Sequence, residues 1–282
     1  MFKPAIATAV VILMVWTFSA EFLAQGRGQG PRPAPAPAPR WPDGRVNLGA
    51  PPGDKGVWER RTEHLVMNPR SYQAPATRNA RVHIDQAPLQ PWARALTIER
   101  HASALASEPY TRCKPAGGPR QFMSPYGLEI VDLPELQRVY VFNISNANSF
   151  RVIYMDGRDH PANLTPGYFG HSIGRWEGDT LVVDTIGTNG RARPINGYVA
   201  GAVTSGVDTA PRLPASDQLH VTERIRLAGD GQYLENEITV DDPKTYLKPW
   251  TVKRYFQRRP DIDLQEYACN DNSRRDAEGQ EP

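Results

Sequence analysis

Runs of alternating apolar and polar residues dominate the second half of the chain, beginning near Leu128. A period of two is typical of β-strands that bury one face and expose the other. We therefore expect a mainly β domain over residues 128–272, followed by a disordered tail over residues 273–282. The segments expected to be strands are Arg138–Ile144, Arg151–Met155, His171–Trp176, Thr180–Ile186, Leu219–Leu227, Gln232–Val240, Pro249–Gln257 and Asp263–Cys269.

Glycine-containing turns separate several of these runs, at Asp156–Gly157, Glu177–Asp179 and Ala228–Gly231. Short turns of this composition join neighbouring antiparallel strands into hairpins. Sequential hairpins with few helices predict an antiparallel up-and-down, lipocalin-like barrel or a curved meander. An open sandwich is the alternative.

The first half of the chain shows a different pattern. Residues 91–107 (PWARALTIERHASALAS) place apolar side chains at helical spacing, with Pro91 in the first turn and Pro109 beyond the end. This segment predicts one N-terminal helix. The rest of residues 41–127 is rich in Pro, Gly, Asn and Arg and has no sustained period. We expect a long irregular arm that wraps the β domain.

The N-terminus has the pattern of a secretory signal. Lys3 is followed by an apolar stretch from Ala5 to Ala20, and small residues precede a cleavage point after Ala24. Residues 1–24 are therefore expected to be a signal peptide, with an uncleaved anchor as the alternative. Residues 25–40 alternate Pro and Ala, which favours an extended linker. The protein is expected to be exported, to the periplasm or as a secreted protein.

Composition narrows the function classes. The chain has 23 glycines and 27 prolines among 282 residues, which excludes an all-helical bundle. The net charge of +2 is too small for a nucleic-acid-binding or anionic-membrane-binding surface. The partner we expect is a small molecule, apolar or amphipathic, because the predicted barrel strands carry apolar faces.

The two cysteines, Cys113 and Cys269, form a natural pair in an exported protein. A disulfide between them would close a long loop and stabilise the fold by roughly 4 kcal/mol on the chain-entropy model. A catalytic thiol lacks a supporting arrangement of neighbouring residues.

Three predicted strand faces carry a polar residue in phase with apolar ones: Glu223, Asn236 and Arg254. A charge on an inner face is costly unless it is paired. Glu223 and Arg254 are therefore expected to pair with each other. Such a pair is either a structural ion pair that holds the barrel register or the polar end of a ligand pocket.

Histidines supply the candidate acid–base chemistry. His160 follows a crowded turn, and His171 begins a strand on the face that also carries Arg175. The best acid–base pairing is His160 or His171 with Asp156 or Asp184. The residues from Asp156 to His160 also have the composition of an ordinary turn without catalytic function. The candidate catalytic residues are His160, His171, Arg175 and Glu223, and the candidate ligand-binding residues are Asp156, Arg158, Asp184, Asn236 and Arg254.

Motifs for metals and cofactors are absent from the sequence. It has no zinc-type His or Cys spacing, no phosphate-binding loop and no dinucleotide fingerprint. Residues 170–174 read G-x-S-x-G, but they lie in a predicted hairpin strand, whereas a nucleophile elbow needs a strand, a sharp turn and a helix. We expect neither a metal nor a cofactor.

Four longer motifs are GHSIGRWEGDTLVVDTIG (Gly170–Gly187), LHVTER (Leu219–Arg224), ITVDDPKTYLKPWTV (Ile238–Val252) and EYACNDN (Glu266–Asn272). Together with shorter pieces upstream, they resemble a widespread, uncharacterised family of exported bacterial proteins, mostly labelled hypothetical. The resemblance covers most of residues 41–272 and implies no particular activity. This chain departs from the family pattern at Ile186–Asn189 and in a Gly- and Ala-rich insertion up to Gly206.

Three function hypotheses follow. The first is an exported small-molecule-binding protein with a lipocalin-like barrel, which requires a cavity with one polar end. The second is a cofactor-independent hydratase, lyase or isomerase on the same scaffold, which requires acid–base groups within hydrogen-bond reach. The third is an envelope structural or interaction protein that uses the linker and the arm.

Overall fold

The structure is a computed structural model that describes residues 39–50, 55–59, 82–102, 113–115, 117–123, 127–143, 150–191, 195–198, 212–228 and 231–264. The chain divides into two compact units, residues 1–34 and 35–282, and all described residues belong to the second. The predicted signal peptide, nearly all of the predicted linker and the predicted tail lie outside the described residues.

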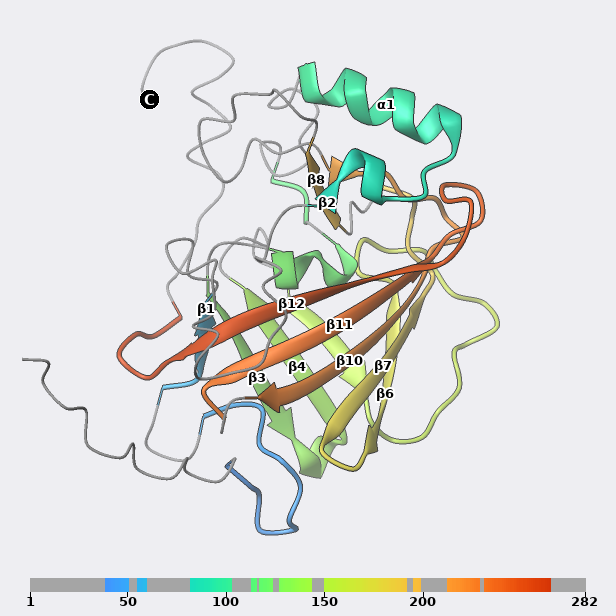
Figure 1. Cartoon of the computed structure of the whole chain (residues 1–282). Helices are drawn as coiled ribbons and strands as arrows, with labels where there is room; N and C mark the ends of the chain where they lie inside the picture. The colour runs from blue at the N-terminus through green and yellow to red at the C-terminus, as the bar shows by residue number, and fades with distance from the viewer. Residues whose placement is uncertain are drawn as a thin grey trace, which may run out of the picture. The chain divides into compact units, whose positions relative to one another are not determined.

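A closed β-barrel forms the body of the described chain (Figure 1). Its strands follow the order β1–β12–β11–β10–β7–β6–β5–β4–β3, and β1 closes the barrel by pairing with both β12 and β3. The prediction of a mainly β barrel is therefore confirmed. The strands are β1 Val57–Glu59, β3 Leu128–Leu133, β4 Arg138–Asn143, β5 Phe150–Tyr154, β6 His171–Glu177, β7 Thr180–Ile186, β10 His220–Ala228, β11 Tyr233–Asp241 and β12 Trp250–Arg259.

The remaining elements are short. Three strands form a separate small sheet, β2 (Val82–His83), β8 (Ile195–Tyr198) and β9 (Arg212–Leu213). The described ranges contain one α-helix, α1 (Pro91–Ala102), which begins at the predicted residue, while residues 103–112 lie outside them. Short 3-10 helices are η1 Ile84–Gln86, η3 Gly118–Met123 and η4 Pro134–Leu136. No helix in the described part of the chain is long and apolar enough to cross a membrane.

Two hairpin predictions are confirmed. β6 and β7 pair antiparallel up to Glu177 and Thr180, and Gly178 between them has a φ of 58°, which favours glycine. β10 and β11 pair antiparallel along their whole lengths.

Three predictions need correction. β5 and β6 pair in parallel, so Asp156–Gly157 is no hairpin and instead begins the connection of residues 155–170. β1 belongs to the barrel, although it lies in the segment predicted to be an irregular arm. Of the strand predicted at Asp263–Cys269, Asp263 and Leu264 are not in a strand, and the rest lies outside the described residues.

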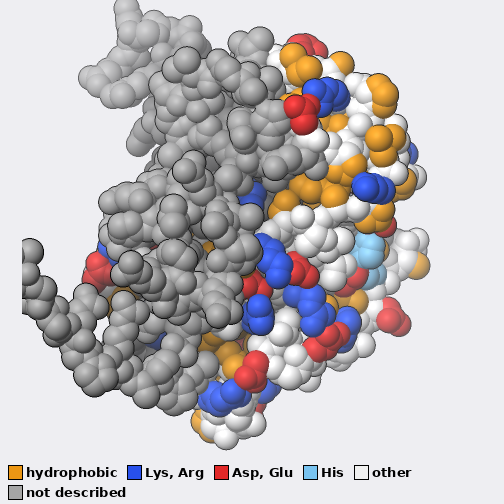
Figure 2. Space-filling view, in the orientation of Figure 1, with side chains coloured by type: hydrophobic (Ala, Val, Ile, Leu, Met, Phe, Trp, Pro, Cys, Tyr) orange, Lys and Arg blue, Asp and Glu red, His pale blue; other side chains and the backbone are white. Residues whose placement is uncertain are grey.

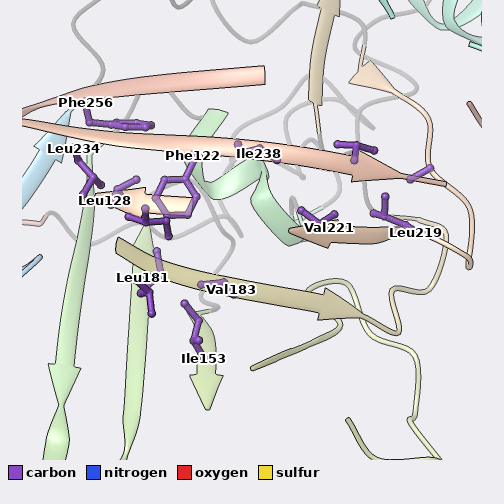
Figure 3. Packing of buried hydrophobic residues seen from close by; sticks show 14 of the residues in the cluster. Phe122, Leu128, Ile153, Leu181, Val183, Leu219, Val221, Leu234, Ile238 and Phe256 are labelled. Carbon is purple, nitrogen blue, oxygen red and sulfur yellow. The ribbon is translucent and has the colours of Figure 1, made fainter. Parts of the chain in front are cut away.

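Apolar side chains pack against one another inside the barrel (Figure 3). They come from alternate positions of the strands, as the period of two requires. Phe122 of η3 is fully buried and meets the ring of Phe256 edge-on, with centroids 5.9 Å apart. The inward positions include Leu128, Ile153, Leu181, Val183, Val221, Leu234 and Ile238.

The predicted disulfide stays a prediction. Cys113 is among the described residues and has a φ of 49°. Its expected partner, Cys269, lies outside them.

Candidate functional site

An ion pair lies inside the barrel, between Arg151 of β5 and Glu223 of β10. Nη2 of Arg151 is 2.5 Å from Oε2 of Glu223, and the two side chains are 1% and 0% exposed. Arg151 also donates from Nε to Oγ of Ser172 (3.0 Å) and from Nη2 to Oγ1 of Thr185 (2.7 Å). The guanidinium therefore joins β5 to three other strands, β6, β7 and β10.

The predicted inward positions of Glu223, Asn236 and Arg254 agree with the structure, where they are 0%, 0% and 4% exposed. Asn236 donates from Nδ2 to Oε1 of Glu223 (2.9 Å), and Arg254 lies directly opposite Asn236 on β12. The ion pair itself differs from the prediction, because the structure pairs Glu223 with Arg151 instead of Arg254. Arg151 alternates in phase with buried Ile153, and this pattern could have identified it as an inward residue.

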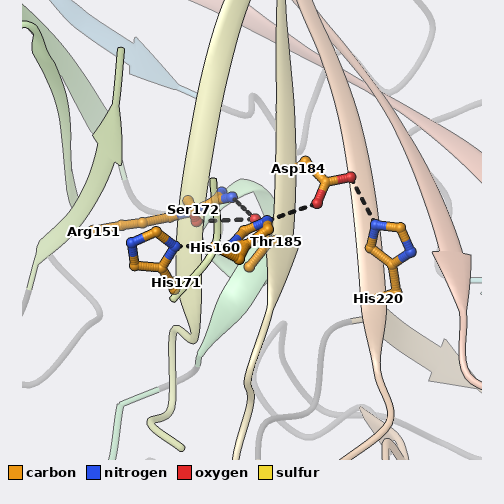
Figure 4. Close-up of polar contacts among 7 residues, drawn as sticks. All are labelled: Arg151, His160, His171, Ser172, Asp184, Thr185 and His220. Atoms are coloured by element: carbon orange, nitrogen blue, oxygen red, sulfur yellow. Dashed lines mark hydrogen bonds and ion pairs between the residues drawn. The ribbon is translucent and has the colours of Figure 1, made fainter. Parts of the chain in front are cut away.

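A second polar cluster, the outer histidine cluster, consists of His160, His171, Asp184 and His220 (Figure 4). Nδ1 of His160 is 2.8 Å from Nδ1 of His171, and its Nε2 is 2.8 Å from Oδ1 of Asp184. Nε2 of His220 is 2.7 Å from Oδ2 of Asp184. Three imidazoles and one carboxylate thus form an unbroken hydrogen-bonded chain.

Strand alternation explains why the two clusters lie back to back. His171 precedes Ser172 on β6, and Asp184 precedes Thr185 on β7. Successive side chains of a strand point to opposite faces, so Ser172 and Thr185 meet Arg151 inside while their neighbours project outside. The contacts that hold the inner cluster therefore also fix the strands that carry His171 and Asp184.

His160 reaches the cluster from the 155–170 connection, which is anchored at both ends. Near its start, Arg158 pairs with Asp156 and lies 4.1 Å from the ring centroid of Tyr154. Near its end, Gly167 donates from its backbone N–H to Gly187 O (3.1 Å). These contacts hold the connection against β5 and against the chain that follows β7.

Gly170 sets the entry of the chain into β6, directly before His171. Its φ is 67°, and an added Cβ would lie 2.3 Å from the carbonyl oxygen of Ile186. Both the backbone conformation and the close approach require glycine here.

The hydrogen-bond geometry fixes the donors to Asp184, and the rest of the proton arrangement follows for a neutral His160. A carboxylate only accepts, so His160 and His220 both donate to Asp184 from Nε2. A neutral His160 then has a bare Nδ1, which accepts the Nδ1–H of His171. Nε2 of His171 is left as the basic nitrogen at the end of the chain.

The pKa values of the cluster move in opposite directions. The hydrogen bond from His220, followed by that from His160, lowers the pKa of Asp184, and the same bond to Asp184 raises the pKa of His220. Burial lowers the pKa of His171, and the neighbouring His160 and Arg158 lower it further. His171 therefore favours its neutral form while His220 favours its protonated form, the separation expected of a base and an acid.

The other candidates do not join this cluster. Arg175 forms an exposed pair with Glu177 (2.7 Å), within a set of ion pairs that covers the outer face of the barrel strands. Asp156 and Arg158 pair with each other, and Glu223 is inside the barrel. The four predicted catalytic residues thus do not converge, although His160, His171 and Asp184 do.

Solvent reaches the outer histidine cluster. The side chains of His160, Asp184 and His220 are 15%, 29% and 44% exposed. Figure 2 shows histidine side chains at the surface, beside acidic and basic ones. His220 is not among the candidate residues predicted from the sequence. Its position in phase with Arg224, on the outward face of its strand, could have identified it.

No group of three or more His, Cys, Asp or Glu side chains in the described ranges is arranged to hold a metal ion.

Comparison of the chain with protein-family models, with curated proteins and with solved structures found no match. The resemblance to a family of exported bacterial proteins stays a prediction.

Removing Arg151 should destabilise the fold strongly. In Arg151→Met, Glu223 would be buried without a counter-charge, which costs about 3–5 kcal/mol of unfolding free energy. The double variant Arg151→Met/Glu223→Leu should recover much of this loss, because no buried charge remains. Urea unfolding measures both. A single variant as stable as the wild type would contradict the buried ion pair.

The contribution of His220 to stability should fall as the pH rises. Its folded pKa is raised above the ordinary value, so the extra stability is fully present below about pH 6.5 and is lost as the pH passes through the raised pKa. His220→Gln, which keeps an N–H donor, should cost up to about 1 kcal/mol at pH 6, since the pair is partly exposed. The cost should be smaller at pH 9. An equal or larger cost at pH 9 in urea unfolding would contradict the charged pair.

Proposed function

We propose that this chain is an exported enzyme that transfers protons on a small molecule, as a cofactor-independent hydratase, lyase or isomerase. The observation that carries the proposal is the unbroken chain from His171 through His160 and Asp184 to His220, with contacts of 2.7–2.8 Å. Reactions of these classes can proceed with one or two positioned acid–base groups. Export would place the activity outside the cytoplasm.

The chain supports a proton relay. Nε2 of His171 takes a proton from the substrate, and its Nδ1–H passes to Nδ1 of His160. The imidazolium formed at His160 is stabilised by Asp184, as a carboxylate stabilises the imidazolium of a catalytic dyad. Return of the proton along the same path protonates a different substrate atom in an isomerase, or the leaving group in a lyase.

His220 contributes from the other side of Asp184. Its raised pKa keeps it protonated toward neutral pH, and its hydrogen bond holds the second carboxylate oxygen. Asp184 then presents one oxygen to His160 in a fixed direction. His220 is therefore a positioning residue in this proposal.

A ligand-binding barrel is the second candidate. In the described part of the chain, Nη1 of Arg151 and Oδ1 of Asn236 are buried without a hydrogen-bond partner. Such atoms are rare in folded proteins and ask for an explanation, of which a bound polar group is one. However, Arg151, Glu223 and Asn236 already pair among themselves, which favours the structural ion pair. The envelope-interaction hypothesis depends on segments outside the described residues and stays a prediction.

Deuterium exchange at carbon tests the proton relay. Phenylpyruvate in D₂O is the probe, because its methylene protons are acidic and exchange is followed by proton NMR. The wild-type protein should accelerate the exchange, and His171→Ala should reduce the acceleration by roughly 100-fold or more, the usual contribution of a general base. His160→Ala should also reduce it.

The matched control is Arg224→Met, on the outer face of β10 and paired with Glu177. This variant should accelerate the deuterium exchange of phenylpyruvate as much as the wild type does. Exchange in the presence of wild-type protein no faster than with the His171→Ala variant would contradict the proposal.

A further inference from the structure

Three aromatic rings lie together on the outer face of β4 and β5. Tyr140, Phe142 and Phe150 are in mutual contact, with ring centroids 5.7–6.1 Å apart. The rings of Tyr140 and Phe142 are nearly parallel, at 17°, and Phe150 is 50% exposed. We call these three residues the aromatic surface. Rings offer a large apolar contact area that is already ordered.

The aromatic surface leads toward the outer histidine cluster along β5. Phe150 is followed on the same face by Val152 and Tyr154. The ring of Tyr154 stacks on His171, with centroids 5.0 Å apart and an angle of 18°. Phe150 and Tyr154 are four positions apart along β5, a distance of roughly 13 Å. One elongated small molecule can therefore touch both places.

An arginine lies beside Tyr154, on the strand that also carries Tyr140 and Phe142. Arg138 is directly opposite Tyr154 in the β4–β5 ladder, and its guanidinium is 5.6 Å from the centroid of the Tyr154 ring. Within the described ranges no carboxylate pairs with Arg138, whereas nearby Arg158 is neutralised by Asp156. A half-buried guanidinium with no counter-charge suits a carboxylate or another oxyanion.

We propose that the aromatic surface and Arg138 form the substrate-binding surface of the outer histidine cluster, and that the substrate is an amphipathic anion. Its apolar ring system rests on Phe142, Phe150 and Tyr140, its anionic group meets Arg138, and its reacting end extends to His171. This inference rests on the proposed function, because the bound anion is a substrate only if the outer histidine cluster is catalytic. Binding of the anion can be measured without catalysis.

Binding of a matched pair of probes tests the proposal. The probes are 2-naphthylacetate and its neutral amide, 2-naphthylacetamide, each followed by naphthyl fluorescence anisotropy. The wild type should bind the carboxylate more tightly than the amide. Arg138→Met should weaken carboxylate binding at least tenfold and leave amide binding unchanged. Phe150→Ala should weaken both.

Leu247→Ala is the control for a general loss of exposed apolar area, since Leu247 is 65% exposed in the β11–β12 connection. It should leave both probes unaffected. Thermal unfolding of each variant should match the wild type. The proposal is overturned if neither probe binds at millimolar concentration, if Arg138→Met weakens both probes equally, or if Leu247→Ala has the same effect as Phe150→Ala.

The two proposals fail in different ways. His171→Ala should reduce the catalysed exchange by roughly 100-fold or more and leave naphthylacetate binding intact. Probe binding without any catalysed exchange in the wild type would keep the surface and reject the enzyme. Catalysed exchange that Arg138→Met and Phe150→Ala leave unchanged, without probe binding, would keep the enzyme and reject the surface. A dimer that buries the aromatic surface, detected by sedimentation, would also contradict the proposed substrate-binding surface.

Discussion

The buried ion pair between Arg151 and Glu223 is the constraint on which the arrangement of this molecule depends. A charge at 0% exposure is sustainable only when it is paired and hydrogen-bonded, so the strands that carry these groups must keep their register. Arg151 adds hydrogen bonds to Ser172 and Thr185, which extends the same requirement to β6 and β7. One guanidinium thus ties together strands that are far apart in the sequence.

The same strands present acid–base groups to solvent. His171 and Asp184 are the immediate neighbours of Ser172 and Thr185, on the opposite face of the wall. The contacts that fix Ser172 and Thr185 inside the barrel therefore also fix His171 and Asp184 outside it. Proton transfer over hydrogen-bond distances requires such fixed positions. The opposite pKa shifts of His171 and His220 follow from this geometry, because one ring is desolvated and the other is paired with Asp184.

Local patterns in the sequence predicted local structure well. The period of two located seven of the strands to within a few residues and correctly placed Glu223 and Asn236 inward. Of the four histidine–aspartate pairings that the sequence left open, the structure contains the one between His160 and Asp184. Alternation gives the face of a residue but not its partner across a closed barrel, so Arg151 was missed as the partner of Glu223. The parallel pairing of β5 with β6 and the closure by β1 depend on long-range contacts that no local period encodes.

The contacts of Arg151 fix β6 and β7, and these strands hold His171, His160 and Asp184 in one hydrogen-bonded chain. The nitrogen-15 chemical shifts of the imidazole rings, measured by long-range proton–nitrogen NMR against pH, test it most directly. The account predicts a neutral His171 protonated at Nδ1 near pH 7, with a titration midpoint below the ordinary 6.5, and a His220 midpoint above it. Three histidines that titrate together near 6.5, with the shifts of freely exchanging tautomers, would contradict it.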